Sequence, residues 1–137
     1  MGKRRSKYIP KGFESDSRSN DTSANIYESM LESEAFMDLT KNQRLLYVYC
    51  KKQYYGKRKP QRDYPDIEEF KSEECFYFCL SMAERYGLYT RKNKGQFYKD
   101  MKALVSHGFI DVVSNGKYTK SKTIYRYSYA WKLWKHG

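Results

Sequence analysis

Hydrophobic and polar positions alternate with helical spacing between residues 93 and 108, and this pattern predicts a helix with one apolar face. Successive residues of a helix turn by about 100°, which places these apolar side chains on one stripe: Phe97, Met101 and Leu104. The opposite face is small or polar and carries Gly95, Lys99, Lys102 and Ser106, with Gln96 at its edge. Asn93 and Gln96 have the spacing of a capping box, so we expect the helix to begin near Lys94 and to end at Gly108.

A shorter helix is predicted before this one. Ser81 and Glu84 have the spacing of a second capping box, and Gly87 is expected to end that helix. Leu88 then packs in the turn that leads to the longer helix. A short helix, a turn and a longer helix form the order of a helix-turn-helix unit, in which the N-terminal residues of the second helix read DNA bases.

Two hydrophobic runs after the longer helix, residues 109–113 and 123–127, read as paired strands. A two-residue turn at Asn115 and Gly116 would leave the second run without a partner, so we expect a long hairpin loop. Three lysines project from this loop, either to contact phosphate or the minor groove or only to be solvated: Lys117, Lys120 and Lys122. A further strand is predicted at residues 76–78.

Another helix is predicted in the N-terminal half of the chain. Thr40 and Gln43 form a capping box that opens it, and the helix runs over residues 41–54 until Gly56 ends it. Its buried stripe is expected to contain Leu45, Val48, Tyr49 and Lys52, with Leu46 beside them. Residues 26–39 carry scattered apolar side chains, so a short helix or an extended segment that docks on the domain is expected there.

These elements predict an α+β fold over residues 26–137, a winged helix-turn-helix with a three-helix core and a β-hairpin wing. Residues 1–25 have little to bury and are expected to form a flexible basic and polar arm, either solvated or in contact with DNA. The predicted core contains Phe97, Met101, Leu104, Leu45, Tyr49, Ile110 and Tyr127. Trp131 and Trp134 are expected to close this core, with a dimer contact as the alternative.

Positive charge is concentrated in the predicted helix-turn-helix and wing. The chain has a formal net charge of +11, and residues 87–137 contain eleven Lys or Arg against two acids, Asp100 and Asp111. Such a surface binds the phosphates of a nucleic acid. The expected DNA-binding residues are Thr90, Arg91, Lys92, Asn93, Lys94, Gln96, Lys99, Lys102, Lys117, Lys120 and Lys122.

Within this set, two side chains of the longer helix are expected to face base edges: Lys99 and Gln96. Those at the start of the helix are expected nearer to phosphate: Arg91, Lys92 and Lys94. Gly95 has no side chain and would let the backbone approach DNA closely. The alternative for this pattern is an ordinary amphipathic helix with solvated lysines. The charged side chains of residues 56–74 are basic in the first half of the segment and acidic in the second half. This fits either a surface loop whose charges partly neutralise each other or a contact of the basic half with phosphate.

Other classes of function find little support in the sequence. The three cysteines and two histidines lack the spacing of a zinc site, so buried, unpaired thiols are expected. No glycine-rich phosphate loop or nucleophile motif is present, so no enzyme activity, cofactor or metal is predicted. Asp100 is expected to form a salt bridge at the edge of the lysine face. Without a signal peptide or a long apolar run, the chain is expected to be cytoplasmic, with no membrane partner.

Six segments carry a resemblance to known proteins: residues 39–47, 76–78, 83–88, 97–104, 107–110 and 125–131. They resemble small winged-helix DNA-binding proteins of bacterial mobile elements, especially conjugative plasmids and integrative elements. The resemblance implies double-stranded DNA as the partner, and a role as transcriptional regulator or as origin-of-transfer accessory factor in conjugation. A relaxase or another transfer or replication protein would be a further partner. The first helix is also similar to that of plasmid replication-initiator modules, so the DNA-binding part of a replication initiation system is an alternative.

A different class of function stays open, namely a winged-helix module that binds RNA or an acidic protein. Salt-dependent affinity for duplex DNA, with preference for one site, distinguishes the DNA-binding hypothesis from this alternative. The oligomeric state is also left open: a palindromic site would imply a dimer, and a single or tandem site a monomer.

Overall fold

The computed structural model describes residues 9–16, 21–54, 74–114 and 123–136. In these segments the chain is α+β, as predicted, with five α-helices, two short 3-10 helices and one three-stranded antiparallel sheet. The α-helices are α1 (Glu28–Leu31), α2 (Glu34–Asp38), α3 (Lys41–Lys51), α4 (Leu80–Arg85) and α5 (Lys94–Ser106). The 3-10 helices are η2 (Arg91–Asn93) and η3 (Ala130–Lys132), and the strands are β1 (Cys75–Tyr77), β2 (Ile110–Ser114) and β3 (Ile124–Tyr127).

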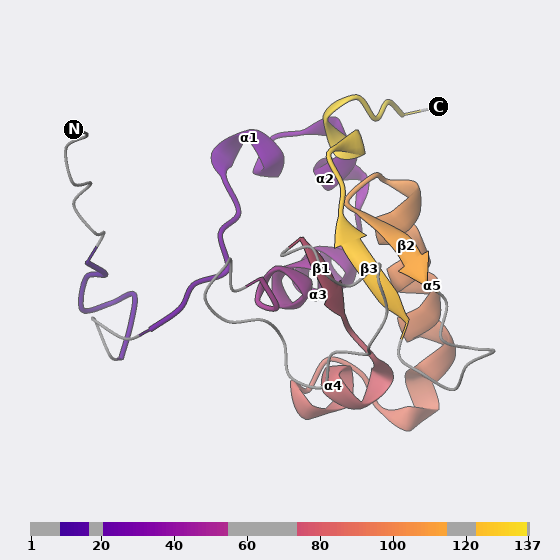
Figure 1. Ribbon diagram of the computed structural model, residues 1–137, viewed down its shortest axis with the longest axis horizontal. Helices are drawn as coiled ribbons and strands as arrows, with labels where there is room; N and C mark the ends of the chain where they lie inside the picture. Colours follow the sequence, from indigo (N-terminus) through magenta and orange to yellow (C-terminus); the bar gives the residue numbers. More distant parts are fainter. Residues whose placement is uncertain (1–8, 17–20, 55–73, 115–122, 137) are drawn as a thin grey trace.

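The strands lie near the middle of the molecule (Figure 1). The strand order of the sheet is β1–β3–β2, so β3 is central and pairs antiparallel with both neighbours. In Figure 1, α4 lies at one end of the molecule, and α1, α2 and η3 lie at the other. The two longest helices, α3 and α5, pack against each other, and α5 also contacts β2. These contacts hold α5 in a fixed position relative to the sheet.

Strands β2 and β3 form the pairing that the sequence predicted. Ile110 lies opposite Tyr127 and Val112 lies opposite Tyr125, with an irregularity before Ser114. Strand β1 pairs with the other edge of β3 and begins one residue earlier than predicted. The residues between β2 and β3 lie outside the described part of the chain, and with them Lys117, Lys120 and Lys122. The contact of these lysines with DNA therefore stays a prediction.

Two other segments with predicted roles lie wholly or partly outside the described residues. They are residues 1–8 and 17–20 of the predicted arm, and residues 55–73, which include Gly56. The described arm residues, 9–16 and 21–25, are mostly exposed. The flexible arm and its contact with DNA stay predictions.

Helix α3 begins with the predicted capping box. The Gln43 backbone N–H donates to Thr40 Oγ1 at 3.2 Å, and the Thr40 N–H donates to Gln43 Oε1 at 3.0 Å. These two bonds satisfy N–H groups that the helix itself leaves without a partner. The helix ends at Lys51, somewhat before the predicted end at Tyr54.

The predicted buried stripe of α3 was wrong. Leu45 is 47% exposed, and the buried residues of the helix are Leu46, Tyr47 and Cys50. The other predicted stripe residues are half-buried or exposed: Val48, Tyr49 and Lys52. Tertiary contacts decide between the two stripes, because the ring of Tyr47 packs 5.1 Å from that of Phe109. The Tyr127 hydroxyl also donates to the Cys50 carbonyl oxygen at 2.6 Å, which turns this side of α3 toward the sheet.

Helix α4 begins earlier than predicted, and the capping box expected at its start is absent. Cys79 is the N-cap residue in an extended conformation, and no side chain caps the helix. Ser81 lies inside the first turn, because the helix begins only a few residues after β1. The predicted end is confirmed. Gly87 has a φ of +76°, and the Leu88 N–H donates to the Ala83 carbonyl oxygen at 2.9 Å, as in a Schellman motif.

Helix α5 ends in the same way at Gly108, as predicted. Gly108 has a φ of +82°, a conformation that residues with a side chain rarely adopt. A Cβ atom at this position would lie 2.6 Å from the backbone N of Trp131 and 2.7 Å from the carbonyl carbon of Ala130. The Trp131 N–H donates to the Gly108 carbonyl oxygen at 2.9 Å. Glycine therefore allows both the turn after α5 and the close docking of η3.

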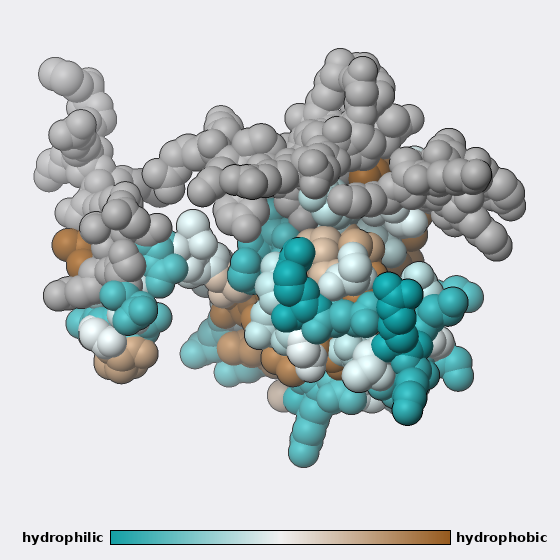
Figure 2. Space-filling view, turned by 90° about the horizontal axis from the view of Figure 1, so that it is seen from below, coloured by the Kyte–Doolittle hydropathy of each residue, from teal (hydrophilic) through white to brown (hydrophobic). Residues whose placement is uncertain are grey.

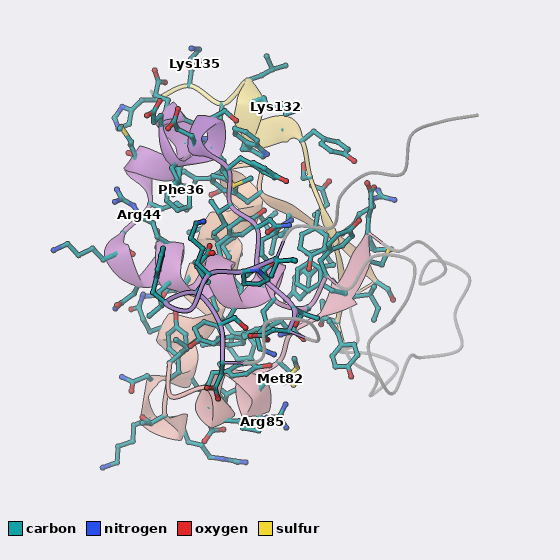
Figure 3. All side chains as sticks on the ribbon, turned by 90° about the vertical axis from the view of Figure 1, so that its left-hand side faces the viewer. Phe36, Arg44, Met82, Arg85, Lys132 and Lys135 are labelled. Atoms are coloured by element: carbon teal, nitrogen blue, oxygen red, sulfur yellow. The ribbon has the colours of Figure 1, made fainter. Side chains whose placement is uncertain are left out.

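Residues 26–39 dock on the domain through two short helices, as the sequence indicated. Phe36 of α2 is buried, and Arg44 of α3 lies beside it (Figure 3). The Arg44 guanidinium donates to the carbonyl oxygens of Phe36, Met37 and Leu39 at 2.8–3.1 Å. Because the last carbonyl groups of a helix have no partner within it, this side chain of α3 satisfies the end of α2.

The C-terminal segment closes the core, which confirms the prediction for the tryptophans. Trp131 and Trp134 are partly buried against the core. The His107 ring stacks on Trp134 at 4.6 Å, and its Nε2 lies 2.7 Å from Asp38 Oδ2. The other oxygen of this carboxylate, Oδ1, lies 3.1 Å from His136 Nε2. Asp38 therefore ties α2 both to the end of α5 and to the C-terminal segment.

Most of the predicted core is confirmed. Four of its members are buried, namely Phe97, Met101, Leu104 and Ile110, and two are partly buried, namely Tyr49 and Tyr127. Cys50 and Cys75 are buried, Cys79 is half-buried, and all three thiols are free, as predicted. None of the helices in the described part of the chain has the length and apolar character that a membrane span requires.

Leu104→Ala is expected to destabilise the fold by about 2–5 kcal/mol, because Leu104 is 0% exposed and its truncation leaves a cavity. Leu45→Ala is the matched control, since the same atoms are removed from a side chain that is 47% exposed. Its cost is expected to be about 1 kcal/mol or less. Equilibrium urea denaturation measures both losses. Equal losses would contradict the opposite placement of these two leucines.

Asp38 is expected to make stability depend on pH in acid. The hydrogen bond from His107 is the main cause that holds the pKa of Asp38 below its ordinary value of 3.8. A carboxylate with a lowered pKa stabilises the fold above its unfolded pKa, and this contribution is lost as the pH falls through the folded pKa. Urea denaturation should therefore show a constant stability difference between wild type and Asp38→Asn from about pH 6 to about pH 5, and a shrinking one below pH 3.8. A difference that stays constant in acid would contradict this.

Candidate nucleic-acid interface

Helix α5 has one buried and one exposed face, with the phase that the sequence predicted. The buried face contains Phe97, Met101 and Leu104. The exposed face contains Gly95, Lys99, Lys102 and Ser106, with Gln96 at its edge. The core thus holds α5 by one side and leaves the lysine side in contact with solvent.

The turn before α5 continues this exposed surface. The 3-10 helix η2 and its neighbours are exposed, namely Thr90, Arg91, Lys92, Asn93 and Lys94. With Gln96, Lys99 and Lys102, these residues form a surface that we call the α5 surface. Figure 2 views the end of the molecule that carries α4 and the start of α5, and long hydrophilic side chains project from it. All predicted contact residues that the structure describes therefore lie on one continuous stretch of surface.

The start of α5 differs from the predicted capping box. Asn93 does not cap the helix, because its backbone (φ −100°, ψ 16°) continues the turn of η2 and is not extended as an N-cap usually is. Its side-chain oxygen accepts a hydrogen bond from Thr90 Oγ1 at 2.7 Å. The Gln96 amide bonds to Asp100. The N-cap side chain makes no bond to the first turn of α5, so it does not satisfy the backbone N–H groups of that turn.

Arg91 forms an ion pair with Glu84 of α4, with 3.6 Å between Arg91 Nε and Glu84 Oε1. The Arg91 side chain is 84% exposed, and so exposed a pair contributes about 1 kcal/mol or less. It orients the guanidinium near the turn and leaves it available for a phosphate. Arg85 of α4 lies at the same end of the molecule and is exposed, although the sequence did not single it out (Figure 3).

Asp100 is buried, which corrects the salt bridge predicted for it. Its side chain is 2% exposed and accepts three hydrogen bonds. The Tyr89 hydroxyl donates to Oδ2 at 2.6 Å. The side-chain amides of Gln43 and Gln96 donate to Oδ1 at 3.1 Å and 2.9 Å. Asp100 therefore joins α5 to α3 and to the turn before η2, and among the described residues it forms no ion pair.

Helical spacing accounts for the burial of Asp100. It follows Phe97 by three residues and precedes Leu104 by four, so it lies on the core side of α5 while the lysines lie on the other. A carboxylate in this position needs hydrogen-bond donors, and Tyr89 is one of them. Burial first, and then the neighbouring carboxylate, raises the pKa of Tyr89, so its hydroxyl stays protonated and donates.

The sequence did not reveal the roles of Gln43 and Tyr89. The helical position of Asp100 on the buried side was the available signal, because a buried carboxylate must find donors. Gln43 lies 57 residues away along the chain and Tyr89 lies 11 residues away. Spacing within one helix cannot identify such partners.

Gly95 lies on the α5 surface with open space around it. A Cβ atom at this position would meet nothing within 4 Å. Packing within the described part of the chain therefore does not require glycine here, in contrast to Gly108. A helix turn without a side chain suits the close approach of another molecule.

Basic residues also occur away from the α5 surface. Lys132 and Lys135 lie at the opposite end of the molecule, around η3 (Figure 3). Acidic residues lie close to that end, because the Glu34 carboxylate bonds to the C-terminal backbone and Asp38 bonds to two histidines. On the α5 surface, the acids found near the lysines are paired or buried. The α5 surface therefore carries the less balanced positive charge.

The described residues contain no group of His, Cys, Asp or Glu side chains arranged to hold a metal ion. Comparisons of the chain with protein-family models, with curated proteins and with solved structures find no match.

Gly95→Ala is expected to stabilise the protein by about 0.5–1 kcal/mol, because alanine favours a helix and its Cβ meets no atom within 4 Å. Gly108→Ala is the contrasting variant. It forces a side chain into a backbone with φ of +82° and against Trp131, so stability is expected to fall. Thermal denaturation measures both changes. A loss of stability in Gly95→Ala would indicate that this glycine serves the fold.

Proposed function

We propose that the chain is a winged helix-turn-helix protein that binds double-stranded DNA with sequence preference and inserts α5 into the major groove. The order α3, β1, α4, α5, β2, β3 and the strand order β1–β3–β2 support this fold. This order gives a three-helix core, a short helix and turn before a longer helix, and a hairpin after it. A helix-turn-helix and a hairpin wing offer DNA two contacts from one rigid domain.

The single observation that carries the proposal is the exposed face of α5. The helix has 13 residues and is therefore about 20 Å long. The core holds one side of it, while Lys99 and Lys102 lie on the other. The major groove of DNA is about 12 Å wide and admits an α-helix. The N-terminal turn of α5 is exposed and basic, and this part of a recognition helix reaches base edges.

Charge supports a polyanionic partner. The chain has a net charge of +11, and residues 87–137 hold eleven Lys or Arg against two acids. Lys and Arg that neutralise phosphates release bound counterions, which drives binding and makes it depend on salt. In this proposal Arg91, Lys92 and Lys94 bind phosphate, and Gln96 and Lys99 face the bases.

The hairpin of β2 and β3 supplies the second contact. Its strands pair over the described residues and lead to a segment that contains Lys117, Lys120 and Lys122. In this proposal these lysines bind phosphate or the minor groove beside the site of α5.

A role on a bacterial mobile element is supported by the resemblance of the sequence to winged-helix proteins of conjugative plasmids and integrative elements. We propose that the protein regulates transcription or marks an origin of transfer in the cytoplasm. A relaxase or another transfer or replication protein would then be a further partner. In this proposal the protein is a binding module and not an enzyme.

An RNA-binding module is the second candidate, and one observation favours it. Tyr98 on α5 is 55% exposed and stands beside Lys99 in the sequence. Exposed aromatic rings next to basic side chains bind unpaired bases by stacking. Competition between a duplex and a single strand of the same sequence distinguishes the two candidates. Preference for the single strand would favour the second.

The double variant Lys99→Ala/Lys102→Ala is expected to weaken duplex binding. It should also reduce the slope of log affinity against log salt concentration by up to about two, because two positive charges are removed from the interface and fewer counterions are released on binding. Lys132→Ala/Lys135→Ala removes the same charge from the η3 end and is the matched control. Titrations of a duplex selected from random sequences, at several salt concentrations, measure both variants.

The control is expected to leave the slope nearly unchanged. Equal effects of the two double variants would show that net charge alone drives binding and that α5 has no special place in it. Failure of the wild type to bind any duplex would refute the proposed function itself.

A further inference from the structure

Asp100 fixes the direction in which the Gln96 side chain presents its amide. The Asp100 side-chain oxygens accept from all three groups that contact them: Tyr89 Oη, Gln43 Nε2 and Gln96 Nε2. The Gln96 amide must therefore turn its nitrogen toward Oδ1, at 2.9 Å, and its oxygen away from it. Without such a partner, a glutamine amide can present either end to a ligand.

The carboxylate itself is held from two other elements. The Gln43 side chain cannot reverse its amide, because its Oε1 accepts from the Thr40 N–H at 3.0 Å in the capping box of α3. Its Nε2 then donates to Asp100 Oδ1 at 3.1 Å. The Tyr89 hydroxyl fixes the second oxygen at 2.6 Å. With both oxygens bound and the side chain 2% exposed, Asp100 has little freedom to rotate.

The polarity of Gln96 matters because the residue is exposed on the first turns of α5. Its Nε2 carries two hydrogens, and Asp100 accepts one of them. One N–H and the carbonyl oxygen are left for another molecule. A donor and an acceptor held side by side match the N7 acceptor and the N6 donor of adenine in the major groove.

We propose that Asp100 is a positioning residue for DNA recognition, which holds the Gln96 amide in the orientation that reads adenine at one position of the binding site. This inference rests on the proposed function, because it assigns a base to a residue of the same α5 surface. Asp100 itself does not touch DNA. It acts through Gln96, and its own side chain lies on the core side of α5 and is 2% exposed.

Selection of binding sites from random duplexes tests the proposal, with wild type, Asp100→Leu, Tyr89→Phe and Gln96→Met compared. Leucine branches at the same position as aspartate but offers no acceptor, so in Asp100→Leu the Gln96 amide is no longer held in one direction. The wild type is expected to prefer adenine at one position by roughly 5- to 100-fold. Asp100→Leu and Gln96→Met should both lose most of this preference, at the same position, and keep the preference at the others.

Tyr89→Phe is the matched control. It removes a bond to Oδ2 but leaves both bonds to Oδ1, so stability should fall while the adenine preference stays. A merely structural role of Asp100 predicts instead that Asp100→Leu weakens binding to all duplexes alike. An unchanged base preference in Asp100→Leu, or loss of preference at another position than in Gln96→Met, would overturn the proposal.

A second measurement tests the proposal if Asp100→Leu does not fold. In nuclear magnetic resonance spectra of the free wild-type protein, the Gln96 side-chain amide protons should exchange slowly with water, because one of them is bonded to a carboxylate that is 2% exposed. Exchange as fast as in an unbonded glutamine would overturn the proposal. A wild type that binds no duplex would instead contradict the proposed function and leave this amide bond in place, so the two failures are distinguishable.

Discussion

The burial of one side of α5 is the constraint on which the rest of the structure depends. Phe97, Met101 and Leu104 anchor the helix in the core, and this fixes which side chains face solvent. The same buried side contains Asp100, a carboxylate that must be hydrogen-bonded to be tolerated there. Its donors come from α3 and from the turn before η2, so the position of α5 is set by polar as well as apolar contacts. A recognition surface that is rigid before binding loses less conformational entropy when it binds.

A second group of contacts joins α2, the end of α5 and the C-terminal segment. Arg44 satisfies the end of α2, and Asp38 ties that helix to His107 at the end of α5. Gly108 lets the C-terminal segment approach closely on the same side. These interactions pair charged and polar groups at the end of the molecule that carries α2 and η3. At the other end, the acids that the structure describes near the basic groups are paired or buried, namely Glu84 and Asp100, and this favours the binding of a polyanion.

Local signals in the sequence predicted the elements whose boundaries depend on a few neighbouring residues. The capping box at Thr40, the helix end at Gly108 and the pairing of β2 with β3 belong to this class, because each follows from residues close together in the chain. Prediction from the sequence was wrong where contacts between residues far apart in the chain decide which side of a helix is buried. Leu45 and Leu46 fit a helical stripe equally well, and contacts of α3 with the sheet and with Phe109 select Leu46. The hydrogen bonds of the candidate site join residues from three elements, which no periodicity reveals.

We propose that α5 and the turn before it form the DNA-binding surface. The most direct test is to titrate the protein with the selected duplex and to follow its backbone amide chemical shifts by nuclear magnetic resonance. We expect the largest changes in chemical shift at residues 90–102 and in the hairpin of β2 and β3. Residues 129–136, at the opposite end of the molecule, should change little. Changes concentrated on that opposite end, with residues 90–102 unaffected, would contradict the account and move the interface to η3 and α2.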